Sequence, residues 1–515
     1  MGCKLDLPEA PQQFQDSGQC SRHRQGPEEE GLLQRHQCTP SGGCDFPDQE
    51  IVVLHNKHSI LCRRDRFLDR EACEEETAEV RILRSRLLLK GSQTEMYSLL
   101  KELFPICRSI TGDGVRESLG IIGRRIPLRV TEVPSGTRCF DWTVPDEWNI
   151  SSASITDSKG RKTVDFADNN LHVVNYSEPF SGTLEREELM PHLHSIPSQP
   201  DVIPYVTTYY KRRWGFCLRH KDLLKLKKGK YKVEIKSSLK PGSLTFADAV
   251  IPGRTKKEIV ISSYLCHPSL ANDSISGVVV ATHLYKYLKA RKDNYYSYRF
   301  IFVPETIGAI AYLKMHKEHF LKNVYAGLVL TCLGDSGPFN YKKTRQGDHS
   351  LDRICANVLK HSGHPYSLRE FWLPGSDERQ YSSPGFNIPV GSLMRSVYGE
   401  FKEYHTSDDD LNFVKEKHLE ETLQMYKSVI DAVESDFHYI NLNPFCELHL
   451  SKYGLGSNPF KQEDPNRYFR KILTLLNFSD GKHSLCEIAD KLDVPVLELA
   501  EFAKTLEQKK LMRRS

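Results

Sequence analysis

The segment between Ile251 and Asp436 alternates short apolar stretches with longer stretches of helical periodicity. We expect strands at 258–264, 298–303, 324–332, 366–372 and 388–394, and helices at 276–290, 307–320, 350–361 and 413–434. Such alternation is typical of an α/β fold in which helices cover both faces of a doubly wound, mostly parallel sheet. In this fold the loops that follow parallel strands meet along one edge of the sheet, where ligands bind.

Three regions differ from this alternating pattern. Residues 1–92 are rich in Gln, Glu, Arg, Gly and Pro, and we expect them to form a disordered extension. Residues 129–246 show the two-residue alternation of strands and are expected to form an inserted β-rich domain. The main α/β domain would then span residues 93–440, interrupted by this insertion.

Residues 441–515 form the third region and contain three helical segments. Ser484 precedes Glu487 by three residues, which is the capping-box pattern of a helix start. The order of helices and turns predicts a winged-helix-like module. Its second helix is acidic, with Glu498, Glu501 and Glu507, and would repel phosphate. We therefore expect this module to bind a protein partner, with DNA binding as the weaker alternative.

Composition limits the classes of partner. The net charge of +4 is small for 515 residues and gives no electrostatic case for nucleic acid or a membrane surface. No stretch approaches the roughly 18 apolar residues of a membrane span. Six of the 14 cysteines lie in the first 73 residues and the rest occur singly, without a CxxC pair. This usage favours reduced thiols and a cytoplasmic location.

Polar residues that could bind a metal follow the strand at 258–264. His267 and Asp273 lie six residues apart in the loop that leads to the next helix. Imidazole and carboxylate groups are common metal ligands. For this loop alone, a hydrogen-bonded histidine and a helix-capping aspartate are the plainer explanation.

Further polar clusters follow the later strands of the same sheet. They are Glu305, Asp335, the loop Gly375–Gln380, and His405 with Asp408, Asp409 and Asp410. Each has an ordinary explanation as a helix cap, a turn or a solvated helix start. Structural ion pairs do not usually bring together two loop histidines from distant parts of a chain. The convergence of these clusters therefore favours a metal site at the sheet edge.

The same residues carry a resemblance to a known family. The matching motifs, in chain order, are Arg108–Gly112, Leu265–Ser269, Pro304–Gly308, Gly375–Tyr381 and Tyr404–Asp409. With them, the chain resembles the zinc aminopeptidases of the co-catalytic metallopeptidase clan. It is most similar to mostly microbial members with an inserted β domain and a C-terminal winged helix, which are often encoded near polysaccharide biosynthesis genes. The resemblance covers the chain from about residue 94 to the C-terminus.

The resemblance implies roles for particular residues. His267 matches the first histidine ligand of the aminopeptidases, and His405 matches the late histidine ligand. Asp273 matches the aspartate that bridges two metal ions. Glu305 falls on the position of the general base.

The chain also departs from the aminopeptidase pattern. Thr306 replaces a ligand glutamate, and Thr331 lies near the place of a ligand aspartate, with Asp335 four residues later. Glu378 replaces a histidine. The resemblance therefore implies one zinc ion and leaves the second open.

The implied function is a zinc-dependent hydrolase of aminopeptidase type that cleaves an amide bond through a metal-bound water. Its substrate would be a small peptide or another amide-bearing molecule. Glu378 and Arg379 would face this substrate and bind an amine or a carboxylate. Two alternatives remain. One is an inactive scaffold that binds a peptide or glycan, favoured by the missing ligands. The other is an amidohydrolase of an N-acylated sugar or polysaccharide precursor, favoured by the genomic setting of similar proteins.

Overall fold

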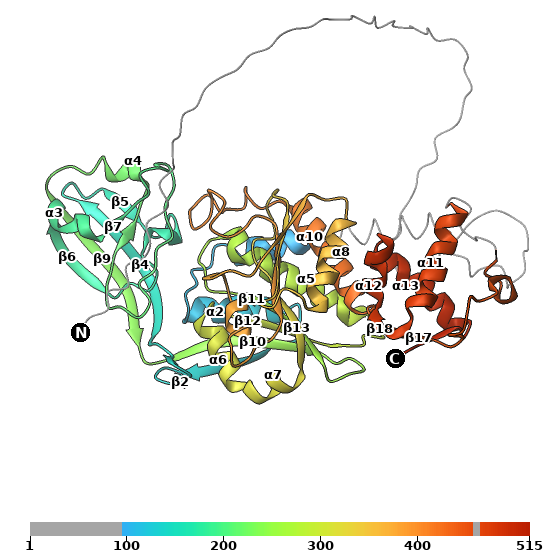
Figure 1. Ribbon diagram of the computed structural model, residues 1–515. Coiled ribbons are helices and arrows are strands. Elements are labelled where there is room, and N and C mark those ends of the chain that lie inside the picture. Colours follow the sequence, from blue (N-terminus) through green and yellow to red (C-terminus); the bar gives the residue numbers. More distant parts are fainter. Residues whose placement is uncertain (1–94, 457–463) are drawn as a thin grey trace, which may run out of the picture. The chain divides into compact units, whose positions relative to one another are not determined.

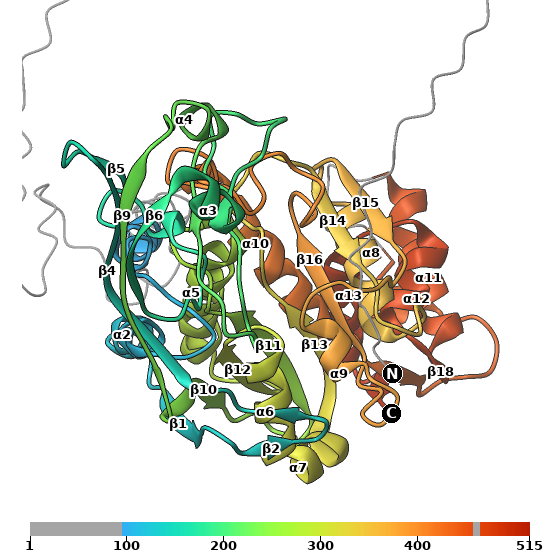
Figure 2. The ribbon, with the colours of Figure 1, turned by 90° about the vertical axis from the view of Figure 1, so that its left-hand side faces the viewer.

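The computed structural model describes residues 95–456 and 464–515, and the predicted extension at 1–92 lies outside them. The centre of the fold is an eight-stranded sheet (Figures 1 and 2). In spatial order its strands are β1 (Arg129–Pro134), β10 (Ser243–Ile251), β12 (Ser297–Val303), β11 (Glu258–Tyr264), β13 (Val324–Val329), β16 (Val390–Met394), β14 (Phe339–Lys342) and β15 (Tyr366–Arg369). The central strands β12, β11, β13 and β16 are parallel to one another. The predicted mostly parallel α/β sheet is confirmed.

Helices cover both faces of this sheet (Figure 1). One face carries α5 (Gly277–Ala290), α8 (Ser350–Lys360) and α10 (Glu416–Val433), with α2 (Asp113–Gly123) and the helical residues 95–103. The other carries α6 (Ile307–Met315) and α7 (Lys317–Asn323).

Strand β11 shows why two cores form, because alternate side chains of a strand point to opposite faces. Ile259 and Ile261 enter the core with α5, and Val260 enters the core with α6. The close fit of helix and sheet appears at Gly277, where a Cβ atom would lie 2.1 Å from the carbonyl oxygen of Leu330. Helix α5 therefore starts directly against the end of β13.

Two elements differ from the sequence expectation. Strand β14 was not predicted, because its four residues lie among the turn-forming glycines and aspartates between Gly334 and Asp348. The helix expected at 307–320 is two helices, since α6 ends at Met315 and α7 begins at Lys317.

A second sheet lies between β1 and β10 in the chain. Its strands, in spatial order, are β5 (Lys162–Asp165), β4 (Glu147–Asp157), β9 (Lys230–Lys240) and β6 (Phe180–Glu185). The expected alternation is present in β9, where Tyr231, Val233 and Ile235 are buried. Shorter elements complete this segment: β2 (Arg138–Cys139), β3 (Trp142–Thr143), β7 (Leu193–His194), β8 (Phe216–Cys217), α3 (Arg186–Leu189) and α4 (His220–Leu223). The division of the chain into domains stays a prediction.

The C-terminal part forms a winged helix. It consists of β17 (His438–Asn441), α11 (Pro465–Phe478), β18 (Asp480–Ser484), α12 (Leu485–Leu492), α13 (Val496–Gln508) and β19 (Met512–Arg514). The predicted capping box is present, because the Ser484 side chain accepts from the Glu487 amide and Glu487 accepts from the Ser484 amide.

Helix α13 begins against α8. Asn357 of α8 accepts a hydrogen bond from the amide of Val496 and donates one to the carbonyl of Val494, at 2.8 and 3.1 Å. In DNA-binding helix-turn-helix proteins the start of the second helix contacts bases. In this chain the start of α13 instead contacts α8 through Asn357. The predicted protein partner of the module stays a prediction.

No helix among the described residues combines the length and the apolar character needed to cross a membrane.

One cluster of charges joins the two sheets. Arg116 of α2 lies 3.1 Å from Glu132 of β1 and 2.6 Å from Glu147 of β4. Glu147 also accepts a hydrogen bond of 2.9 Å from the amide of Ser243, at the start of β10. The bond from Arg116 holds the pKa of Glu147 at about 2, below its usual value near 4.5. The carboxylate of Glu147 is thus favoured in the folded state.

We predict that Glu147→Gln lowers the free energy of unfolding at pH 7 by about 1–2 kcal/mol. A depressed pKa stabilises the fold above the unfolded value and loses that effect as pH falls. The difference between wild type and variant should therefore shrink between pH 4.5 and pH 2. Urea unfolding at several pH values measures it. The exposed Glu187→Gln is the control, and a difference independent of pH would contradict the prediction.

Candidate metal centre

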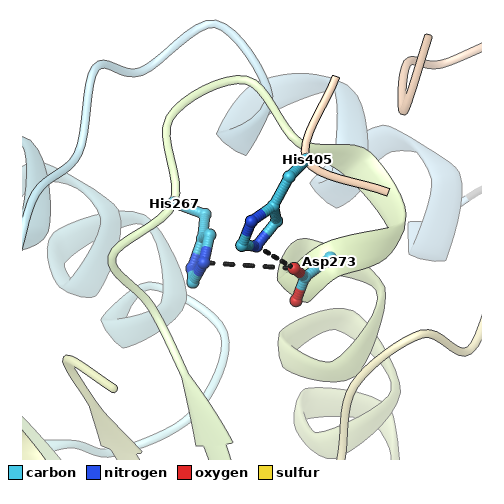
Figure 3. A group of neighbouring side chains, drawn as sticks. All are labelled: His267, Asp273 and His405. Carbon is cyan, nitrogen blue, oxygen red and sulfur yellow. Dashed lines mark ion pairs between the residues drawn. The ribbon is translucent and has the colours of Figure 1, made fainter. Parts of the chain in front are cut away.

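Three predicted ligands meet at the edge where the parallel strands end (Figure 3). His267 lies in the loop after β11, and Asp273 lies in the turn Ala271–Ser276 that precedes α5. His405 lies in the long loop between β16 and α10. The three potential ligand atoms, one from each residue, all lie within 4.8 Å of one another. The side chains point toward one common position.

Two polar atoms of this cluster lack hydrogen-bond partners. Nε2 of His405 lies 3.1 Å from Oδ2 of Asp273, and Nε2 of His267 lies 3.9 Å from the same oxygen. Asp273 Oδ2 and His405 Nε2 are both buried without a hydrogen bond in the described part of the chain. Buried polar atoms normally have a partner. Two imidazoles and a carboxylate are a donor set that zinc accepts, so these residues fit a metal ion.

The second oxygen of Asp273 is fully engaged. Oδ1 accepts hydrogen bonds from the hydroxyl groups of Tyr264 and Thr331, the latter at 3.2 Å. The hydroxyl oxygens of Tyr264 and Thr331 lie 2.7 Å from each other, so the two hydroxyl protons are shared among these three contacts. Burial alone would raise the pKa of Asp273, but His267, His405 and Tyr264 hold it below its usual range. Asp273 is therefore an oriented carboxylate with one oxygen left for the cluster.

Asp409 fixes the backbone that carries Asp273. Its two carboxylate oxygens accept from the amides of Asn272 and Asp273, at 2.6 and 2.9 Å. The side chain of Asn272 donates to Asp335 at 2.8 Å and accepts from the amide of Gly334 at the same distance. Asp335 lies four residues after Thr331, near the place of the missing ligand aspartate. In the structure it accepts a hydrogen bond from Asn272 and so holds the loop that carries Asp273.

The imidazole of His267 is buried and uncharged. Burial lowers the pKa of the imidazole to about 4. A neutral imidazole carries one N–H and leaves the other ring nitrogen free to bind a metal. Nδ1 lies 3.4 Å from the sulfur of Cys266. The backbone carbonyl of His267 accepts from Nε of the buried Arg108 at 3.0 Å. Arg108 belongs to the motif Arg108–Gly112, and through this hydrogen bond it fixes the loop that carries His267.

His405 is fixed by the inserted segment. Its carbonyl accepts from the amide of Tyr205 at 2.7 Å, and Ile203 exchanges hydrogen bonds with Ser407 at 2.9 and 3.0 Å. The ring of Tyr205 lies 5.1 Å from each of the rings of His267 and His405. The side chain of His405 remains 35% exposed. The cluster is therefore open to solvent on the side of His405.

Glu305, the predicted base, follows β12 and reaches the cluster. Its Oε2 lies 3.9 Å from Nε2 of His267, and its Oε1 accepts from the hydroxyl of Ser376 at 3.2 Å. Burial, together with the charges of Asp377 and Asp273, raises the pKa of Glu305 to about 8. Burial likewise raises the pKa of Asp377 to about 7. The structure thus places beside the metal-binding atoms a carboxyl group that can hold or release a proton near neutral pH.

Thr306 stands where the aminopeptidases have a ligand, but it faces elsewhere. Its backbone has φ +63°, a strained value for a β-branched residue. Its amide donates to Asp377 at 2.8 Å, and its hydroxyl accepts from Arg379 at 2.9 Å. The hydroxyl of Thr306 is therefore directed to Arg379 and not to the histidines. Such strain is common at functional sites.

The predicted role of Glu378 in facing a substrate does not fit the structure. Its side chain is fully buried and forms a 2.5 Å ion pair with Lys342, which is also fully buried. The adjacent Arg379 points the other way and lines a cavity. Consecutive residues of a helix point in different directions. The sequence alone does not say which of the two, Glu378 or Arg379, faces the cavity.

A cavity of about 360 Å³ opens beside the cluster and reaches His267, Glu305 and His405. Aromatic residues of the inserted segment form one wall: Trp142, Tyr205, Tyr209 and Tyr210. The cleft is thus built jointly by the strand-end loops and the insertion.

Sequence reasoning missed several residues of the site. Asp409 looked like part of a solvated acidic run, and Tyr264 looked like the last residue of a buried strand. Tyr205 and Tyr209 gave no local signal, since they reach the site from the insertion. The one sequence feature that could have pointed to Asp409 is its position four residues after His405.

Comparisons with known proteins agree with this architecture. Residues 97–436 match a family model described as a domain of unknown function, DUF4910, and residues 438–514 match a winged helix-turn-helix model. A protein of Clostridium acetobutylicum is 46% identical over 436 residues, which cover 83% of this chain and 99% of that protein. It carries the provisional name of polysaccharide biosynthesis protein with aminopeptidase-like domain.

Two solved structures are also similar. A crystal structure from Clostridium acetobutylicum, provisionally named a peptidase, has a TM-score of 0.79 and 45% identity, and covers 84% of this chain and 100% of that one. A zinc aminopeptidase of Bacillus subtilis has a TM-score of 0.49 and 12% identity, over 66% of this chain and 95% of its own. The second similarity is too low to transfer a function. The aminopeptidase-like resemblance and the C-terminal winged helix are confirmed.

We predict that Asp409→Ala lowers the free energy of unfolding by about 2–4 kcal/mol, because it leaves two buried amides without an acceptor. The neighbouring Asp408 is exposed, so Asp408→Ala should change the free energy by less than about 0.5 kcal/mol. Urea unfolding of both variants measures the difference. Equal effects would show that Asp409 does not hold the turn that carries Asp273.

Proposed function

This chain belongs to the DUF4910 family, and on that premise we propose that it is a zinc-dependent hydrolase that cleaves an amide bond. The observation that carries the proposal is the cluster of His267, Asp273 and His405, in which Oδ2 of Asp273 and Nε2 of His405 form no hydrogen bond. Glu305 beside the cluster supplies the acid–base group that hydrolysis needs.

We propose one zinc ion, held by Nε2 of each histidine and Oδ2 of Asp273. Three protein ligands with an open position are typical of catalytic zinc sites. Thr306 and Thr331 have their hydroxyl groups on Arg379 and Asp273, so neither offers a free group for a second ion.

When bound, zinc would polarise a water molecule and lower its pKa toward about 7. The chain's own contribution is the movement of protons. Oε2 of Glu305 would accept a proton from that water and give it to the departing amine. Ser376 holds the other oxygen of Glu305, which keeps Oε2 directed at the cluster. The ring of Tyr205 packs beside both imidazoles, with ring centres 5.1 Å apart in each case.

A second candidate is an amidohydrolase that acts on an N-acylated sugar or polysaccharide precursor. It is favoured by the name of the Clostridium acetobutylicum relative, which refers to polysaccharide biosynthesis. The cluster and Glu305 would serve this reaction equally well, since it also breaks an amide bond. An inactive scaffold is the outcome to be expected if the protein binds ligands without hydrolysing any amide.

We predict that purified protein equilibrated with zinc and desalted retains about one zinc ion per chain. His267→Ala should retain much less, because only two ligands remain. Metal analysis by mass spectrometry measures the content. The exposed His449→Ala is the matched control and should keep the wild-type content. Equal zinc in wild type and His267→Ala would refute the site.

We predict that Glu305→Gln loses about 10²–10⁴-fold in kcat while it retains its zinc, because the amide cannot accept the proton. The assay uses aminoacyl anilides and N-acyl amino sugars, followed by release of the amine. Glu318→Gln on the exposed face of α7 is the control. Full activity of Glu305→Gln would exclude Glu305 as the base. Zinc binding without hydrolysis of any amide by wild type would favour the scaffold.

A further inference from the structure

The charges that line the cavity are unusual for a site that binds an amine. Apart from the two histidines of the cluster, the charged side chains in its wall are Glu305 and Arg379. Glu305 is committed to proton transfer in the proposed function. Arg379 is thus the charged group left for recognition of a substrate.

Arg379 has donors to spare. Its Nη1 donates to the carbonyls of Pro374 and Gly375, at 2.9 and 3.0 Å, and its Nη2 donates to Thr306 at 2.9 Å. A guanidinium carries five N–H donors, so these three bonds leave about two of them. In the part of the chain that the structure describes, no carboxylate forms an ion pair with Arg379. These three hydrogen bonds hold its head group, and its positive charge partly offsets the rise in the pKa of Glu305 and Asp377.

No carboxylate remains to bind the ammonium group of a free peptide N-terminus. Glu378 is fully buried on Lys342, and Asp377 is buried and bonded to the amide of Thr306. Neither residue lines the cavity. An ammonium group in the cavity would instead meet the positive charge of Arg379. The site therefore disfavours substrates with a free amine and favours an anion.

The rest of the wall suits an apolar or ring-shaped group. Trp142 and Tyr210 pack edge to face with ring centres 5.5 Å apart, although each keeps more than a third of its surface exposed, 41% and 48%. Large aromatic side chains left exposed beside a cleft are typical of ligand contacts. Tyr205 and Tyr209 continue this wall toward the cluster and bond to each other at 2.9 Å.

From this arrangement we propose that the cavity takes N-acylated substrates that carry a carboxylate close to the amide bond, and that Arg379 binds the carboxylate. The inference rests on the proposed hydrolase function and specifies its substrate class. An N-acyl amino acid and a carboxylated N-acyl sugar share this chemistry. In both, the aromatic wall would contact the apolar side chain or the sugar ring.

Binding, which needs no turnover, tests the proposal. Isothermal titration calorimetry of zinc-equilibrated protein compares N-acetyl-L-phenylalanine with its primary amide, N-acetyl-L-phenylalaninamide. A charge-assisted hydrogen bond to a carboxylate should favour the acid by roughly tenfold or more. L-Phenylalaninamide, with a free amine, should bind more weakly than both. Equal affinity for acid and amide, or tighter binding of the free amine, would overturn the proposal.

A second pair of probes separates the two sources of the carboxylate. N-acetylmuramic acid is compared with N-acetylglucosamine, which lacks the carboxylate. Tighter binding of the sugar acid than of N-acetyl-L-phenylalanine would assign the site to sugars, and the reverse to amino acids. Either result supports the carboxylate requirement, and no preference for the acid in either pair contradicts it.

Variants assign the preference to Arg379. Arg379→Gln should reduce the preference for the acid to about twofold or less, because the glutamine side chain has no charge to attract the carboxylate, while the affinity for the amide changes little. Arg379→Lys keeps the charge and should retain part of the preference. Arg345→Gln is the matched control, since Arg345 also donates to a carbonyl but does not line the cavity. Circular dichroism verifies folding, and an undiminished preference in folded Arg379→Gln would refute the role.

The outcomes separate this proposal from the proposed function. A preference for the acid without any hydrolysis would support the carboxylate site and contradict the hydrolase. Hydrolysis of anilides with free amines, without a preference for the acid, would support the hydrolase and overturn the carboxylate site.

Discussion

The two oxygen atoms of Asp273 are held differently, and the site depends on that difference. Oδ1 accepts from the hydroxyls of Tyr264 and Thr331, whereas Oδ2 is buried beside the two imidazoles and accepts no hydrogen bond. A buried carboxylate oxygen in that position is costly unless it binds a cation. The bonds from Asp409 to the backbone prevent the carboxylate from turning away. Asp409 therefore organises the loop, and Asp273 keeps one oxygen for a metal ion.

The inserted segment completes the site from the other side. Ile203 and Tyr205 form backbone bonds with the loop of His405, and the ring of Tyr205 packs beside both imidazoles. The same segment supplies the aromatic wall of the cavity. One piece of chain thus positions a candidate ligand and shapes the substrate space. A change in the insertion should affect both together, which links the choice of substrate to the geometry of the metal site.

Most of the main sheet could be predicted because its strands and helices are long and periodic. Helix α5 and strand β11 begin and end within a residue of the expected limits. The misses were short or interrupted elements, namely β14 and the break at His316, where local pattern is too brief to decide. In the site, loop position and residue type indicated His267, Asp273 and His405, and the structure brings them together. Their roles as ligands stay a proposal.

The order of the strands and helices could be predicted from the sequence, and with it the loops that meet at the carboxyl ends of the parallel strands. Periodicity and residue type are local properties, so they can be recognised in the sequence without knowing how the chain packs. The direction of each side chain within those loops depends on how the folded chain packs. That packing buried Glu378 against Lys342, turned Arg379 into the cavity, and brought Tyr205 from the insertion. Those outcomes depend on contacts between residues far apart in the chain, which no local pattern records.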